Sequence, residues 1–298
     1  MTINRALSND RTMKALTGMS IEEFEGLLPG FESALLEQKS KQKRQRKVGA
    51  DPKGALKDSS MKLLFILFYL KVYPTFDLAG VLFDVDRSRP CRWVGTFLPI
   101  LEKLLGYQCD LPKRRIRSMQ QFQENFPEIK DIFLDGSERA IQRPSSPKNQ
   151  KGCYSGKKKS HTRKNLILCD QSKRILLVSP IKKGSIHDKT LLEKECWAGF
   201  IPEEVTLWAD KGFQGIAKLL SNADRLMMPK KKPKAQELSE QDKKQNRLIS
   251  GLRILVEHAI AGIKRMGAVK DIYRNRKGQA DQFILLSAAL WNYHLRVS

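Results

Sequence analysis

The chain has 298 residues, 41% of them hydrophobic, so it is long enough to bury a sizeable core. Its 55 Lys and Arg against 32 Asp and Glu give a formal net charge of +23, which favours a polyanionic partner, DNA first and an anionic membrane surface second. No apolar run reaches the roughly 18 residues of a membrane span and no signal-peptide core is visible, so we expect a soluble, cytoplasmic, nucleoid-associated protein without a membrane partner.

The first 45 residues are predicted to be helical and to end in a basic linker. Apolar residues recur at helical spacing between Ile21 and Leu35, and Ser20 with Glu23 three residues later has the spacing of a capping box. The stretch 39–47 is strongly basic and leads into glycine and proline, so we expect a loop there.

Residues 46–110 are predicted to form a small helical DNA-binding domain. A dense apolar segment at 61–72 runs into Tyr73 and Pro74, which should end a buried helix. Two helices near 75–83 and 87–105, separated by a polar turn, resemble a helix-turn-helix unit. The last helix carries three arginines near its start, where a recognition helix contacts base edges and phosphates: Arg87, Arg89 and Arg92.

From about residue 131 the pattern changes to short apolar runs that are typical of strands. We expect strands at 132–134, 165–169, 175–180, 205–209 and 226–228. Helices should follow Ser185 and span about 245–266 and 280–295, with an exposed polar loop at 230–244. Residues 111–298 are therefore predicted to form a mixed α/β (α+β) domain.

Two aspartates come directly after apolar strands. Asp135 follows Ile-Phe-Leu and precedes Gly136, and Asp210 follows a second apolar run and precedes Lys-Gly. Each strand should deliver its carboxylate to its C-terminal end, and adjacent strands would bring the two together. Clustered carboxylates repel one another unless a cation neutralises them, and such hard oxygen ligands select Mg²⁺ or Mn²⁺.

A third carboxylate lies on the predicted helix at 245–266. Arg253, Glu257 and Lys264 fall along the edge of its apolar stripe, because separations of four and seven residues share one helical face. We therefore predict Asp135, Asp210 and Glu257 as catalytic residues and as ligands of two Mg²⁺ or Mn²⁺ ions. One ion would activate water or a DNA 3′-hydroxyl, and the other would stabilise the leaving oxygen.

Over essentially its whole length the chain resembles bacterial insertion-sequence transposases of the DDE superfamily. The matching segments are Asp135 to Arg139, Tyr154 to Thr162, and Asp210 to Gly215. Arg253, Glu257 and Lys264 stand at the offsets of the family's Tyr, Arg, Glu, Lys helix signature, with Ser250 in the place of the tyrosine. The resemblance implies an RNase H-like catalytic domain preceded by a helix-turn-helix domain.

The function implied is that of a DNA transposase, which would bind element ends, cleave DNA with metal ions and transfer strands, as a homo-oligomer on DNA. Two other functions fit the same residues. An RNase H-like endonuclease that no longer transposes would use the same three acids. A non-catalytic DNA-binding regulator would explain the charge and the helical region, but not the acids at the strand ends.

Two further segments flank the predicted acids. Lys157, Lys158 and Lys159 lie in the connection that begins at the Asp135 strand, so we expect them to contact DNA. Ser185 and Asp188 have spacing like that of a capping box, so Asp188 is interpreted as part of a helix start and not as an additional metal ligand.

Overall fold

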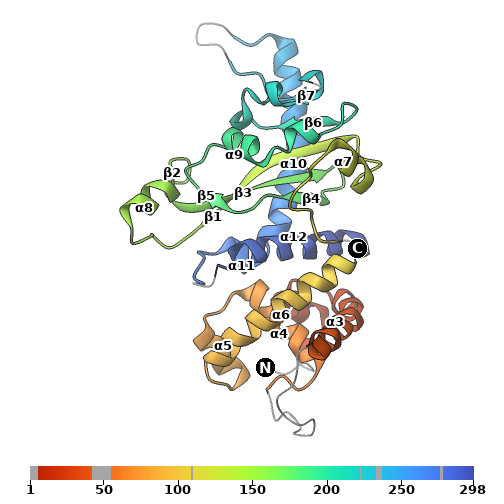
Figure 1. The fold of residues 1–298 in the computed structure, drawn as a ribbon, viewed down its shortest axis with the longest axis vertical. Coiled ribbons are helices and arrows are strands. Elements are labelled where there is room, and N and C mark those ends of the chain that lie inside the picture. Colours follow the sequence, from red (N-terminus) through yellow and green to blue (C-terminus); the bar gives the residue numbers. More distant parts are fainter. Residues whose placement is uncertain (1–5, 42–54, 109, 222, 233–236, 276–277) are drawn as a thin grey trace. The chain divides into compact units, whose positions relative to one another are not determined.

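The computed structural model describes residues 6–41, 55–108, 110–221, 223–232, 237–275 and 278–298 (Figure 1). The chain divides into two compact units, each of which is described by itself. The first, called the helical unit below, consists of Met1–Leu111, Ile263–Asp271 and Gln282–Ser298. The second, called the sheet unit, consists of Pro112–Gly262 and Ile272–Asp281.

These units group the residues differently from the predicted regions 1–45, 46–110 and 111–298. The N-terminal helices share one unit with the helix-turn-helix segment, and most of the last helix, α12 (Ala280–Val297), joins them. The ring of Phe283 lies 6.2 Å from Tyr69 and 5.9 Å from Tyr73. Contacts between segments about 200 residues apart have no local signature, so the sequence pattern did not predict this grouping.

The helical unit begins with α2 (Asp10–Thr17) and α3 (Ile21–Lys41). The predicted capping box is present, since the Ser20 hydroxyl accepts a hydrogen bond from the Glu23 N–H at 3.1 Å and the Glu23 carboxylate accepts one from the Ser20 N–H at 2.5 Å. The predicted loop at 39–47 was wrong in its first residues, because α3 continues to Lys41. Residues 42–54 of that stretch lie outside the described residues.

The predicted buried helix and the helix-turn-helix are confirmed as α4 (Ser59–Val72), α5 (Phe76–Phe83) and α6 (Ser88–Tyr107). Every residue of α4 from Leu63 to Leu70 is buried, and the helix ends at Tyr73 in the left-handed conformation, directly before Pro74. The turn between α5 and α6 is tight: a methyl group at Gly80 would stand 2.7 Å from the Val85 carbonyl oxygen, so only glycine fits there.

The predicted strands are confirmed in one mixed sheet, as is the mixed α/β class. In the described residues, β1 (Asp131–Ala140) pairs antiparallel with β3 (Ser160–Asp170) and parallel with β6 (Thr206–Ala209). The remaining strands extend this sheet: β2 (Tyr154–Ser155), β4 (Ile175–Val178) and β5 (Lys182–Lys183) pair with β3, and β7 (Leu226–Met227) pairs with β6.

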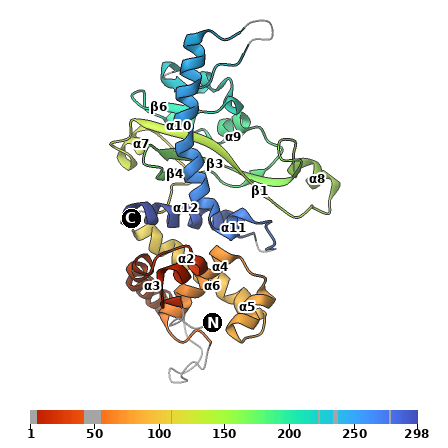
Figure 2. The same cartoon turned by 180° about the vertical axis from the view of Figure 1, so that it is seen from behind.

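The two faces of the sheet are covered differently. Ile132 and Leu134 of β1 pack into an apolar core with α7 (Met119–Asn125) and α9 (Asp188–Glu195). Figures 1 and 2 show α10 (Glu240–Lys264) crossing the opposite face. Because α10 begins at Glu240, the predicted loop at 230–244 is shorter than expected. Successive strand residues point to opposite faces, so Asp135 points to the face crossed by α10.

The rest of the described helices are short or lie in the helical unit. α8 (Pro147–Cys153) precedes β2, and α11 (Gly267–Lys270) packs on α4. No helix among the described residues is long and apolar enough to cross a bilayer.

Candidate active site

Asp135 and Asp210 are neighbours at the edge where β1 and β6 stop pairing. The two strands run parallel, and their last paired residues are Leu134 and Ala209. An aspartate follows each of these two residues, so the register makes Asp135 and Asp210 neighbours at this edge of the β1–β6 pair.

One detail of the prediction was wrong: Asp135 does not end its strand. β1 continues to Ala140, and Asp135 pairs with Ile167 of β3. The chain runs on because β3 offers it a partner as far as Thr162, whereas β6 ends at Ala209. Asp135 therefore pairs with β3 on one side and, within the described residues, has no strand partner on the side where β6 has ended.

The backbone directly after each aspartate holds its carboxylate. The Gly136 N–H donates to Asp135 Oδ1 at 2.7 Å, and the Lys211 N–H donates to Asp210 Oδ1 at 2.6 Å. Burial raises the pKa of Asp135, and the negative charge of Asp210 adds to this, while the Gly136 N–H and the charge of Arg253 act in the opposite direction. The net direction is upward, so the ionised form of Asp135 is incompletely compensated.

Arg253 of α10 lies between two of the predicted acids, Asp210 and Glu257. Its Nη1 lies 3.3 Å from Asp210 Oδ1, and its Nη2 lies 3.7 Å from Glu257 Oε1, one helical turn away. The Arg253 side chain is 21% exposed, whereas that of Glu257 is 57% exposed. Glu257 is thus connected to Asp210 through the guanidinium of Arg253. Lys264 is the last residue of α10 and is grouped with the helical unit.

The three predicted acids do not form a ready-made metal cage. Among the residues that the structure describes, no three His, Cys, Asp or Glu side chains lie in an arrangement that could hold an ion. Arg253 supplies the positive charge between Asp210 and Glu257. The aspartate pair nevertheless suits a divalent cation, because its oxygens are hard ligands and burial disfavours the charge of Asp135.

Asp188 is the first residue of α9, as the sequence indicated, but the predicted capping box with Ser185 was wrong. His187 is the N-cap of α9 and makes no side-chain capping hydrogen bond. The Ser185 hydroxyl donates instead to the Gly152 carbonyl oxygen at 2.6 Å, and Asp188 Oδ1 lies 2.9 Å from Lys164 Nζ. The reason is electrostatic: the Lys164 side chain is 8% exposed, and a buried ammonium group requires anionic partners.

Lys164 is the centre of a charged network that sequence reasoning missed. Its Nζ donates to the Ile186 carbonyl oxygen at 3.0 Å and lies 3.4 Å from Glu138 Oε1. Burial raises the pKa of Glu138. The hydrogen bonds from Ser155 and Thr162 and the charge of Lys164 together outweigh burial, so the net shift of the pKa is downward. Glu138 and Lys164 meet because they are paired residues in the β1–β3 register, which the sequence did not predict.

The predicted DNA-contacting lysines form the turn between β2 and β3. Lys157, Lys158 and Lys159 are exposed, and the turn is fixed by the left-handed Lys159 and by a hydrogen bond of 3.2 Å from the Lys158 N–H to the Ser155 hydroxyl. The charge of Lys157 lowers the pKa of Asp135, opposing the effect of burial. The charge of this turn therefore acts on Asp135.

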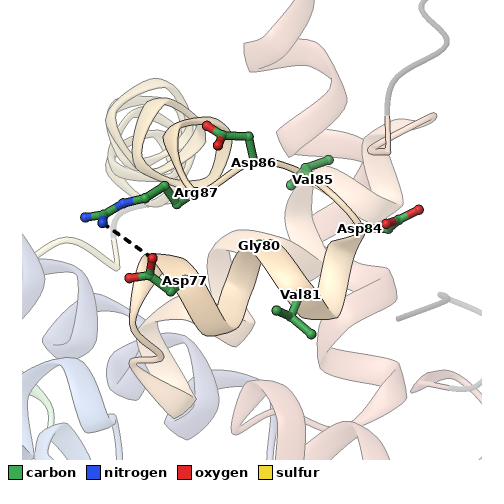
Figure 3. Close-up of a pocket in the computed structure, with 7 residues that line it drawn as sticks. All are labelled: Asp77, Gly80, Val81, Asp84, Val85, Asp86 and Arg87. Atoms are coloured by element: carbon green, nitrogen blue, oxygen red, sulfur yellow. Dashed lines mark ion pairs between the residues drawn. The ribbon is translucent and has the colours of Figure 1, made fainter.

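The three arginines of the helix-turn-helix have different surroundings. Arg87 Nη1 lies 3.4 Å from Asp77 Oδ1, at an open pocket that also includes Gly80 and Asp84 (Figure 3). Arg92 donates to the Ser88 hydroxyl at 2.9 Å. Arg89 is exposed.

Comparison with known proteins covers nearly the whole chain. Residues 134–292 match the family model described as DDE superfamily endonuclease, and residues 55–106 match the helix-turn-helix of DDE superfamily endonuclease. The chain is 30% identical, over 285 residues, to a protein of Microchaete diplosiphon named "Probable transposase for insertion sequence element IS702". That similarity covers 96% of this chain and 95% of the relative. No solved structure gives a significant match.

Proposed function

Because the chain belongs to the DDE-superfamily transposases of insertion sequences, with a helix-turn-helix and an RNase H-like endonuclease domain, we propose that it binds the ends of its element and catalyses metal-dependent cleavage and strand transfer. The observation that carries the proposal is the β1–β6 register, which makes Asp135 and Asp210 neighbours beneath a helix that bears Glu257. Two acids that are adjacent and partly buried are suited to chemistry at a phosphodiester.

Asp135, Asp210 and Glu257 are the residues proposed to hold Mg²⁺ or Mn²⁺, with two ions in the working enzyme. The rise in the pKa of Asp135 and the guanidinium between Asp210 and Glu257 support this, since both indicate a site that requires positive charge. Bound divalent ions would supply Lewis-acid activation of the attacking oxygen and stabilisation of the leaving oxygen.

Arg253 and Lys264 are proposed to hold the scissile phosphate. A cation cannot ligate a metal ion, but a guanidinium offers a planar fork that matches phosphate oxygens. Arg253 sits among the acids, so it has to exchange its carboxylate partners for a phosphate as DNA enters. This exchange would free Glu257 for the metal, and it is the role that we propose for Arg253.

In the first step, a water oxygen forms a bond to phosphorus while the bond from phosphorus to the 3′-oxygen breaks, which leaves a 3′-hydroxyl and a 5′-phosphate. In strand transfer, that 3′-hydroxyl oxygen attacks a target phosphodiester and displaces the target's 3′-oxygen, which takes up the proton. Neither step needs a covalent bond to the protein.

DNA affinity is proposed to come from basic groups outside the acid cluster. These are the helix-turn-helix arginines Arg87, Arg89 and Arg92, and the turn residues Lys157, Lys158 and Lys159. Assembly as a homo-oligomer on DNA and association with the nucleoid remain predictions.

The test uses the full chain, duplex DNA carrying the element's terminal sequence, and Mg²⁺ or Mn²⁺. Asp135→Asn, Asp210→Asn and Glu257→Gln should each lower cleavage by at least about 1,000-fold, because each removes a group that acts at the reacting atoms. DNA affinity should stay close to that of the wild type. The exposed Asp224→Asn is the matched control and should cleave normally.

The same reactions separate the other two functions. Joined target products identify a transposase, and cleavage without joining identifies a nuclease. Specific binding without any metal-dependent nicking would make the chain a regulator and would overturn the catalytic proposal.

A further inference from the structure

Asp188 lies against the backbone that follows both proposed catalytic aspartates. A methyl group built on Gly136 would stand 3.0 Å from Asp188 Oδ1, and one built on Gly212 would stand 3.2 Å from Asp188 Oδ2. One carboxylate therefore touches the residue directly after Asp135 and the residue two after Asp210. A side chain at either position would crowd the Asp188 carboxylate, so the two glycines favour this close approach.

We propose that Asp188, anchored by Lys164, is a positioning residue that fixes the backbone after Asp135 and Asp210 and so sets the separation of their carboxylates for metal binding. The proposal rests on the proposed function, since it assigns Asp188 to the same site.

The position of Asp188, at the start of α9 and against the sheet, argues for action through the backbone. Strand residues alternate between faces, so Gly136 points to the face covered by α9, and Asp135 points to the face crossed by α10. Asp188 opens α9 and contacts Gly136. It therefore supports the acid pair from the reverse side of the sheet.

A short path leads from Asp188 to each catalytic carboxylate. The N–H of Gly136, the residue that Asp188 touches, donates to Asp135 Oδ1 at 2.7 Å. The N–H that donates to Asp210 belongs to Lys211, which is bonded to the second contacted glycine. Displacement of either glycine would move the donor and the carboxylate together.

Lys164 holds Asp188 in this place. Its Nζ lies 2.9 Å from Asp188 Oδ1 and 3.4 Å from Glu138 Oε1, and it donates to the Ile186 carbonyl oxygen at 3.0 Å. One ammonium group thereby joins β1, β3 and the start of α9. The Asp188 side chain is only 21% exposed, which limits its freedom to move away.

The test measures Mn²⁺ affinity by electron paramagnetic resonance and single-turnover cleavage of element-end DNA, in the full chain well below its melting temperature. Asp188→Asn should weaken Mn²⁺ binding and slow the bound-state cleavage rate by about 10- to 100-fold, the usual effect of losing a supporting group around a metal site. DNA affinity should not change. Glu193→Gln, which removes a carboxylate from an exposed pair on the same helix, is the control and should change neither quantity.

A double-mutant cycle tests the contact itself. Gly136→Ala alone should weaken Mn²⁺ binding by about tenfold or more, because its methyl group would meet the Asp188 carboxylate. In an Asp188→Ala background the same methyl group has room, so Gly136→Ala should cost at most about twofold more. Asp188→Glu should not restore binding, since its longer side chain does not fit between the glycines.

Three results would overturn the proposal: wild-type Mn²⁺ affinity in Asp188→Asn, independent effects of Gly136→Ala and Asp188→Ala, or losses that follow melting temperature alone. Preferential rescue of Asp188→Cys by Mn²⁺ over Mg²⁺ would make Asp188 a direct ligand, which also contradicts a positioning role. Failure of the proposed function is recognised separately, because then the wild type shows no metal-dependent cleavage, or Asp135→Asn retains it.

Discussion

Buried carboxylates are treated differently in the two units. In the helical unit, Asp110 accepts two hydrogen bonds from Arg296, at 2.8 and 3.0 Å, and Glu23 accepts hydrogen bonds from the Ser20 backbone and contacts His294 at 2.5 Å. In the sheet unit, the pKa of Asp135 is raised by its own burial and by Asp210. These two acids of the helical unit join distant segments, whereas in the sheet unit the negative charge of Asp135 is incompletely compensated.

The opposite pKa directions express this difference. Burial raises the pKa of Glu23. The Ser20 backbone N–H, His294 and the Ser20 side chain together outweigh burial, so the net shift of the pKa is downward. A carboxylate with a lowered pKa stabilises the fold, whereas one with a raised pKa is poised to gain from a cationic ligand. By this criterion Glu23 is a structural acid and Asp135 is suited to chemistry.

The largest effect expected is on the core of the helical unit. Phe65 is fully buried and packs edge-to-face against Phe83 and Trp93, with centroids 5.3 and 5.1 Å away. Phe65→Ala should lower the free energy of unfolding by about 3–5 kcal/mol because it leaves a cavity. Hydrogen exchange read by mass spectrometry should show the loss in α4 peptides.

The exposed Leu36→Ala, in the same unit, should change little and serves as the control. Equal loss of protection in β1 and β3 would show that the two units unfold together, and would contradict the expectation that the substitution acts on the helical unit alone.

The next largest effect concerns Arg253. Arg253→Ala and Arg253→Lys should both slow DNA cleavage by about 100-fold, because neither offers a fork to the phosphate, while Mn²⁺ affinity should be unchanged or higher. Single-turnover rates and Mn²⁺ titrations provide the measurement. The exposed Arg247→Lys, on the same helix, is the control. Loss of Mn²⁺ binding in Arg253→Ala would instead make this arginine a structural residue of the kind found in the helical unit.

Much of this organisation could be predicted because it is local. Helix caps such as Ser20 with Glu23, the buried run in α4, and aspartates after apolar strands each depend on residues a few positions apart. The same logic misjudged Asp135, because the continuation of β1 depends on β3, more than 20 residues later in the chain.

Non-local contacts account for the rest. Asp188 had spacing suited to capping, but its carboxylate pairs with a buried lysine of strand β3. The grouping of α12 with the N-terminal helices likewise rests on pairs such as Asn292, which donates to the Asp110 carbonyl oxygen at 2.9 Å. Periodicity and composition carry no information about partners so far apart in sequence.

A smaller effect is expected in the helix-turn-helix, where charge faces outwards. Arg89→Ala should weaken binding of the full chain to element-end DNA by about 1–3 kcal/mol if Arg89 reads a base. Arg87→Ala should cost less, because Arg87 is already paired with Asp77. Titrations at several salt concentrations against end and random DNA give both numbers. Equal weakening on the two DNAs would assign Arg89 to phosphate contact and not to sequence recognition.

The smallest effect concerns the pH dependence of the stability that Glu23 contributes. Since the folded-state pKa of Glu23 lies below its ordinary value of 4.5, its contribution is present above that pH and is lost as pH falls through the folded pKa. Glu23→Gln should therefore destabilise the helical unit by about 1–2 kcal/mol at pH 7, and this difference should shrink below pH 4.5. His294 contacts the carboxylate, and the charges of Lys14 and Arg265 interact with it, so His294→Gln is measured in parallel by urea denaturation at pH 7, 5 and 3. A difference that grows as the pH falls would reverse the sign assigned to Glu23 and would place it with Asp135, among the acids whose charge the fold does not compensate.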